Sequence, residues 1–193
     1  MTKGWEKEKK MTGFAVTENE RSRVDGICYL FLIFLAGCLL GYLYEEIFYW
    51  FTEGMLRNRG ILFGPWLPIY GIGALGIYAL KPLKSYPILL FLLCALISGV
   101  VEYIIGYAGI RLFDMRLWDY RGLFLNIQGI ICLRSVLSFS VMGVVFHYLL
   151  EPLAEQTFQR ADPDKIRIFC FVVLGFLLFD CVLSAMFRVP ITY

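Results

Sequence analysis

Apolar residues form long runs along most of the chain, separated by short polar segments. Four runs are long enough to cross a membrane as helices, and they cover residues 27–49, 86–110, 127–150 and 168–187. A shorter apolar run covers residues 68–80, which makes roughly 20 Å of helix against roughly 30 Å of hydrocarbon in a bilayer. The pattern predicts an all-α, polytopic transmembrane helix bundle of about five spans, the second of them short.

The segment from Arg59 to Gly73 is too apolar for an ordinary loop and too rich in Gly and Pro for an ordinary helix. Pro65 and Pro68 each lack a backbone donor and disfavour helical geometry in the residue before them, so a helix begins only near Pro68. Irregular backbone at membrane depth is tolerated only where protein buries it or where it lines a wet cavity. We therefore predict a re-entrant or interfacial loop, which is where transporters with discontinuous helices place binding sites.

The polar segments predict the domain organisation and the orientation. Residues 1–25 have mixed charge and form a solvated, charged tail before a single bundle domain over residues 26–188, and residues 189–193 form a short tail. Residues 151–167 have the composition of a surface helix followed by a turn. With alternating spans, Lys and Arg are more numerous on the side of the membrane that holds the N-terminus. Because basic residues are in excess on the cytoplasmic side, this favours a plasma-membrane protein with a cytoplasmic N-terminus.

This topology brings the Gly/Pro loop and the loop over residues 111–125 together on the outer face. The residues predicted to form this loop and its mouth are Arg57, Arg59, Gly60, Gly64, Pro65, Pro68, Tyr70, Gly71, Trp118, Asp119 and Tyr120.

Composition supports a membrane protein and excludes several other classes. The chain is 59% hydrophobic with a mean hydropathy of +0.68, whereas soluble domains are typically about 45–50% apolar. The net charge is only +2 and the basic residues are spread out, so no nucleic-acid partner is predicted. The six cysteines lie in apolar segments without CxxC spacing, which indicates packing residues. No cofactor, metal or catalytic motif is predicted.

Ionisable residues within the apolar runs are the candidate site residues: Glu45, Glu46, Glu102, Arg134 and Asp180. A charge at the centre of a membrane helix costs about 2.5–3.5 kcal/mol, so these side chains should face one another or a wet cavity. All except Glu46 are expected at one depth in the outer half of the bundle. We predict that Arg134 pairs with Glu102 or Asp180, because a guanidinium cannot lose its proton.

This charge cluster has two interpretations. It is either a structural ion pair that fixes helix register or a polar site, and its excess of carboxylates suits a cation, a proton relay or an amine-bearing substrate. Arg57 and Arg59 favour a competing ligand, because they lie beside the N-terminus of the short helix and would attract an anionic headgroup or a carboxylate. His147, near a helix end, is interpreted as a cap or an interface residue and not as a catalytic one.

Several motifs together resemble a known family. They are Gly41 through Glu46, Arg59-Gly60, Gly64-Pro65, Pro68 through Gly71 with Gly73, Glu102-Tyr103, Trp118-Asp119-Tyr120 and Asn126. With these residues the chain resembles the bacterial membrane proteins of the type IV ABC-transporter (CmpB) family, over roughly residues 39–147. The resemblance implies a permease with a separate ATPase subunit and implies no catalytic residue. Five short spans are few for a transporter, so a permease would need oligomers or a partner, and residues 151–167 are the predicted cytoplasmic segment large enough to receive an ATPase.

Three functional classes remain open. The first is a small membrane subunit of a transport system, with its site in the outer half of the bundle. The second is a membrane-embedded enzyme acting on a lipid or envelope precursor, in which Arg57, Arg59 and Arg134 hold an anionic headgroup while Glu102 and Asp119 act as acid and base. The third is a non-enzymatic assembly or sensing protein in which the charges only lock the bundle. Membrane lipids are partners in all three.

Overall fold

The computed structural model describes residues 2–54 and 60–187, with only the backbone described over residues 2–22 and at Glu53. Within these ranges the chain is helical and contains no β-strand. The elements in chain order are α1 (Thr2–Glu53), α2 (Pro68–Tyr78), the short 3-10 turn η1 (Lys81–Leu83), α3 (Pro87–Phe113), α4 (Leu133–Val145), the π-helical turn η2 (Phe146–Leu150), α5 (Glu151–Arg160) and α6 (Pro163–Phe187).

Four helical stretches in the described residues are long and apolar enough to cross a membrane: Arg23–Thr52, Pro87–Phe113, Leu133–Arg160 and Pro163–Phe187. The short apolar helix α2 accompanies them. This arrangement confirms the predicted helical membrane bundle and its short second span.

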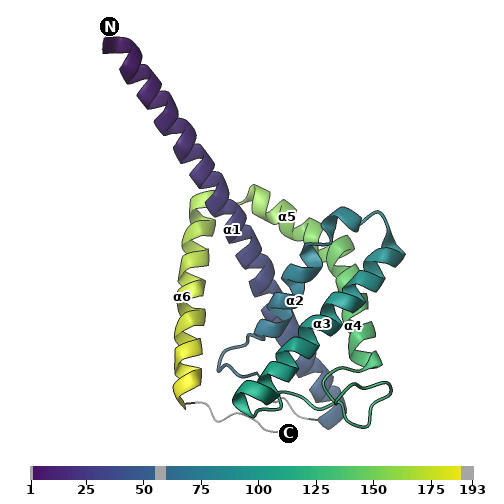
Figure 1. Cartoon of the computed structure of the whole chain (residues 1–193). Coiled ribbons are helices and arrows are strands. Elements are labelled where there is room, and N and C mark those ends of the chain that lie inside the picture. Colours follow the sequence, from purple (N-terminus) through teal and green to yellow (C-terminus); the bar gives the residue numbers. More distant parts are fainter. Residues whose placement is uncertain (1, 55–59, 188–193) are drawn as a thin grey trace.

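The helices form two packed pairs that α2 joins (Figure 1). α1 packs against α2, α3 packs against α4, and α2 also contacts α3, while α6 packs against α1. The irregular segments 60–67 and 114–132 lie at one end of the bundle, which we call the loop end (Figure 1). η1 and α5 lie at the other end, the α5 end, where α1 extends beyond the bundle.

Small residues allow α1 and α2 to pack closely. A Cβ atom on Gly41 would lie 2.1 Å from the Tyr70 ring, and one on Gly37 would lie 2.7 Å from the Cβ of Ala74. Gly71 on α2 faces Cys38 in the same way, at 2.6 Å from its Sγ. The spacing of Gly37 and Gly41 therefore serves close helix packing.

The helix of the fourth predicted span begins later than the predicted start of about residue 127. Residues 127–131 form a tight turn closed by a β-bridge between its two ends, with Gln128 and Gly129 at positive φ. Cys132 then caps α4 through reciprocal bonds with Ser135, so the helix begins only at Leu133. An apolar composition alone does not distinguish such a turn from a buried helical turn.

The first 25 residues also differ from the prediction of a separate tail, because the backbone is helical from Thr2 and continues into the first span (Figure 1). Lys, Glu and Arg are frequent there and are favourable helix formers. The predicted short tail over residues 189–193 lies outside the described residues.

A buried polar cluster joins α5 to η1 at the α5 end. Nε2 of His147 lies 2.7 Å from the carbonyl oxygen of Ile77. One helical turn later, the fully buried carboxylate of Glu151 forms ion pairs with two lysines. Its oxygens lie 2.8 Å from Nζ of Lys81 and 3.3 Å from Nζ of Lys84. The bond to Ile77 places His147 at the contact between η2 and α2, which is an interface position.

Candidate functional site

Glu102 on α3 is a buried carboxyl group, only 3% exposed. Its two oxygens accept hydrogen bonds from the hydroxyl groups of Tyr120 and Ser135, each at 2.9 Å. Both partners are neutral. Among the described residues, no Lys, Arg or His nitrogen lies within ion-pair distance of Glu102.

Glu45 on α1 is half-buried and accepts a 3.0 Å hydrogen bond from the hydroxyl group of Tyr70 on α2. The Tyr70 ring lies directly over Gly41 and packs against Phe139 of α4, with ring centroids 5.3 Å apart. Tyr70 thus contacts both helix pairs and brings the Glu45 carboxylate toward the centre of the bundle.

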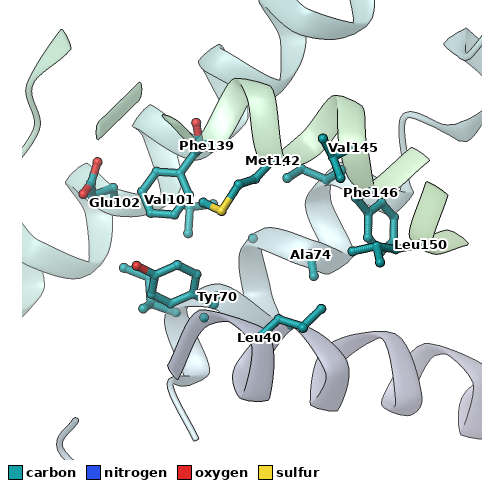
Figure 2. Close-up of a pocket in the computed structure, with 16 residues that line it drawn as sticks. Leu40, Tyr70, Ala74, Val101, Glu102, Phe139, Met142, Val145, Phe146 and Leu150 are labelled. Atoms are coloured by element: carbon teal, nitrogen blue, oxygen red, sulfur yellow. The ribbon is translucent and has the colours of Figure 1, made fainter. Parts of the chain in front are cut away.

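Two cavities meet at Glu102 and Tyr70. The loop-end cavity, about 300 Å³ in volume, is lined by Glu45, Trp118 and Tyr120 among others. The second cavity, which we call the groove, has a volume of about 290 Å³ and extends along α2 between α1 and α4. Four residues line both cavities and form the boundary between them: Ile69, Tyr70, Glu102 and Phe139. Figure 2 shows Glu102 and Tyr70 at one end of the groove and Phe146 and Leu150 at the other.

The loop over residues 114–132 presents its aromatic residues to the loop-end cavity. The indole of Trp118 donates a hydrogen bond to the carbonyl oxygen of Ile130 at 2.6 Å. The backbone amide of Tyr120 donates one to the carbonyl oxygen of Gly129 at 2.9 Å. Asp119, between the two aromatic residues, lines neither cavity. Its carboxylate accepts bonds from Arg121, with Nε 2.7 Å from Oδ2, and these bonds lower the pKa of Asp119.

Asp180 on α6 holds the Gly/Pro loop instead of facing Glu102. Its carboxylate accepts hydrogen bonds from the amides of Phe63 at 3.2 Å and Gly64 at 2.9 Å, and from the indole of Trp66 at 2.8 Å. Ser184, one turn further along α6, donates to the same carboxylate at 3.1 Å. These bonds satisfy the irregular backbone of residues 63–64, as burial in a bundle requires.

The family model described as "Putative ABC-transporter type IV" matches residues 32–185 of the 193-residue chain. The chain belongs to this family. The matched range includes Glu45, Glu102, both cavities and the whole Gly/Pro loop. No curated protein and no solved structure matches the chain.

In this type IV ABC-transporter family member the predicted pairing of Arg134 with Glu102 or Asp180 is wrong. Arg134 is exposed in the first turn of α4, and its guanidinium carbon lies 5.3 Å from the centre of the Phe48 ring. In the described part of the chain Arg134 makes no ion pair. Because α4 starts later than predicted, Arg134 lies at the end of the helix, where a cation–π contact suffices.

The remaining predicted site residues differ in where they lie. Gly60 and Pro68 line the loop-end cavity, while Glu46 lines neither cavity. Gly64 and Gly71 are packing positions, where a Cβ would come within 2.1 Å of Trp66 and 2.6 Å of Cys38; Pro65 is exposed. Arg57 and Arg59 lie outside the described residues.

Sequence reasoning did not identify Ser135 and Phe139, which contact Glu102 and Tyr70 from α4. A signal for Ser135 was available, because a Ser three residues after an N-cap can form a reciprocal cap, and this cap positions its hydroxyl group. Phe139 carries no signal that separates it from the other aromatic residues of the spans.

The arrangement around Glu102 is suited to holding a proton or a cation. A buried carboxylate without a positive partner is costly, and two hydroxyl donors offset only part of that cost. A proton on the carboxyl group, or a cationic ligand beside it, would remove the uncompensated charge. Among the described residues no group of three His, Cys, Asp or Glu side chains could hold a metal ion.

Proposed function

We propose that this protein is the permease-type membrane subunit of an ABC-type transport system and that its substrate carries a positive charge. One observation supports the site: Glu102 is buried, has only hydroxyl partners and lies at the boundary of both cavities. A cation bound there would occupy the one position that both cavities share.

The chemistry of the boundary favours a cation over an anion. An anion beside Glu102 would face a carboxyl group and two phenol oxygens, those of Tyr70 and Tyr120, and the described residues that line either cavity include no cationic side chain. An ammonium group would instead form a charge-assisted hydrogen bond with Glu102 in a low-dielectric environment, where such bonds are strongest.

We further propose that the α5 end faces the cytoplasm and receives the ATPase subunit. Lys81, Lys84, Arg160 and Lys165 lie at that end, in keeping with the excess of basic residues on the cytoplasmic side of membrane proteins. The ion pairs from Lys81 and Lys84 to Glu151 connect α5 to η1, so a force on α5 would reach the end of α2 that borders the groove.

Replacement of Glu102 by Gln in the host cell tests the substrate site. Glu102→Gln keeps the shape of the side chain but removes its charge, and we expect a normal membrane level with loss of rescue of a deletion strain. Glu46→Gln is the matched control, since Glu46 lies in a membrane span but lines neither cavity; it should rescue fully. Full rescue by Glu102→Gln would overturn the proposed site.

Affinity purification at native expression level tests the transport assignment. We expect a nucleotide-binding protein to copurify in stoichiometric amount and to hydrolyse ATP. Charge reversal at the exposed position Arg160, at the end of α5, should weaken this association. If the purified chain contains no ATPase under conditions that preserve rescue, the ABC-type assignment fails, although a cation site at Glu102 could still be tested.

A further inference from the structure

The groove is bordered by two membrane-spanning helices whose lining side chains are also exposed at the surface. Leu40 of α1 is 46% exposed and Val145 of α4 is 44% exposed, and both line the groove. They come from opposite walls, as Figure 2 shows, with Ala74 of α2 between them. Because both helices cross the membrane, the exposed surfaces of these residues face acyl chains, and the groove opens sideways toward the bilayer.

The described lining of the groove contains one carboxyl group on a mainly apolar surface. Among the described lining residues, Glu102 is the only carboxylic acid, and there is no Lys, Arg or His. The hydroxyl of Ser98 is bound to the carbonyl oxygen of Ala95 and that of Tyr70 to Glu45. Each oxygen of Glu102 accepts one hydrogen bond and keeps a second lone pair. The described lining of the groove therefore offers a ligand one carboxyl group and no positively charged side chain.

The shape of the groove fits a single narrow chain. It follows α2 from Tyr70 to Ile77, a distance of roughly 10 Å at 1.5 Å per residue. Glu102 lies at one end, and the apolar side chains of Phe146 and Leu150 lie at the other (Figure 2). The volume of about 290 Å³ is small for a two-chain phospholipid. A phosphate group would also meet Glu102, and the described lining residues include no cation to bind it.

We propose that the groove binds a single-chain amphiphilic amine that enters from the bilayer. Its ammonium group lies on Glu102, and its apolar chain follows α2 toward Phe146 and Leu150. This inference rests on the proposed cation site at Glu102 and adds the class of substrate and its route of entry. The ammonium group provides the positive charge that Glu102 lacks, and the chain buries apolar surface against the walls.

Equilibrium dialysis of the full-length chain in phosphatidylcholine nanodiscs tests the inference. Radiolabelled octylamine is the probe, and empty nanodiscs provide the correction for partition into lipid. Octanol and octyl sulfate, which share the chain but carry a neutral or negative head, are the head-group controls, and ethylamine is the chain-length control.

The wild-type chain should bind about one octylamine saturably, at least tenfold more tightly than ethylamine, because the longer chain buries more apolar surface. Glu102→Gln should weaken octylamine binding about tenfold or more. Ala74→Phe fills the groove and should abolish binding, and Val145→Phe, at the exposed mouth, gives a second block if Ala74→Phe does not fold. Val182→Phe, on the exposed surface of α6, is the matched control and should bind as the wild type does.

Two outcomes would overturn the inference in different ways. Equal binding of octylamine and octanol, or binding that Glu102→Gln leaves unchanged, would exclude an ammonium on Glu102 and would also remove the support for the proposed cation site. Binding of ethylamine as tight as that of octylamine, lost in Glu102→Gln but retained in both groove-blocking variants, would exclude the groove alone. The proposed function would survive that second result.

Discussion

The indole nitrogen of Trp66 donates a 2.8 Å hydrogen bond to Oδ2 of Asp180, although the two residues are far apart in the sequence. The same carboxylate accepts hydrogen bonds from the backbone amides of Phe63 and Gly64, so one side chain of α6 holds the loop that precedes α2. Sequence reasoning assigned this intramembrane acid to a binding site. In the structure it accepts hydrogen bonds from the irregular backbone of the Gly/Pro loop and so holds that loop. Gly60 and Pro68, which lie before and after the residues that Asp180 holds, line the loop-end cavity.

Asp180→Asn should release the Gly/Pro loop. An amide side chain has one acceptor oxygen where the carboxylate has two, so at least one of the loop donors would lose its partner. Hydrogen bonds to charged groups contribute about 1.5–3 kcal/mol, and we expect a loss of stability of that order in thermal unfolding in detergent. Asp114→Asn is the matched control, because Asp114 is exposed and its left-handed backbone also suits Asn. Equal losses of stability in the two variants would contradict the conclusion that Asp180 holds the Gly/Pro loop.

The approximate location of the long apolar helices and of α2 could be predicted from the sequence, because it depends on the length of apolar runs and on Pro68, which determines where α2 begins. The partners of the charged residues could not be predicted in the same way. Counting residues from the span ends estimates depth but says little about which face of a helix a side chain occupies. Arg134 and Glu102 were expected at one depth, yet the turn over residues 127–131 shifts the start of α4 and leaves Arg134 exposed.

Contacts between loops and spans were also beyond prediction. The bond from Tyr120 to Glu102 depends on how the loop over residues 114–132 folds back, which involves positive φ at Gln128 and Gly129. Gly is a common signal for such a conformation, but Gln is not. The sequence therefore predicted Glu102 as a candidate site residue without indicating its partners.

Gly41→Ala should disturb the boundary between the two cavities. The new Cβ would lie 2.1 Å from the ring of Tyr70, so the ring must move and its 3.0 Å bond to Glu45 should break. Overpacking of this kind costs about 1–3 kcal/mol, measurable as a lower thermal unfolding midpoint. Gly175→Ala in α6 is the matched control, because no atom lies within 4 Å of its added Cβ. It should stabilise the helix by roughly 0.5–1 kcal/mol. A neutral Gly41→Ala would mean that the close contact is absent.

Acid should loosen the loop that carries Trp118. The bonds from Arg121 hold the pKa of Asp119 below its unfolded value of about 3.9. A lowered folded-state pKa means that this contribution to stability is present above about pH 3.9 and is lost as the pH falls through the folded value. The indole signal of Trp118 in a ¹⁵N-tryptophan NMR spectrum should shift or broaden in that range. In Asp119→Asn the signal should already be displaced at neutral pH and should not titrate further, while the signal of Trp50 serves as an internal reference.

Glu151→Gln should separate α5 from η1. The buried carboxylate forms ion pairs with Lys81 at 2.8 Å and with Lys84 at 3.3 Å, and both lysine side chains are about one-third exposed. They can turn toward water when the charge of Glu151 is removed, so the loss should be about 1–3 kcal/mol, below that of breaking a fully buried pair. Glu155→Gln is the matched control. Its carboxylate also binds Lys81, but it is 44% exposed, so we expect a loss below about 1 kcal/mol.

The titration of Lys81 separates this local effect from general destabilisation. Hydrogen bonds to Glu151 first, and to Glu155 second, raise the pKa of Lys81. In reductively methylated protein, the ¹³C signal of Lys81 should therefore titrate at a lower pH in Glu151→Gln than in the wild type, with a smaller change in Glu155→Gln. Because the raised pKa stabilises the folded state below the unfolded lysine value of about 10.4, the stability difference between wild type and Glu151→Gln should be fully present at neutral pH. A Lys81 titration that is the same in all three proteins would show that α5 and η1 are held together by other contacts, and the route proposed from α5 to the groove would lose its physical basis.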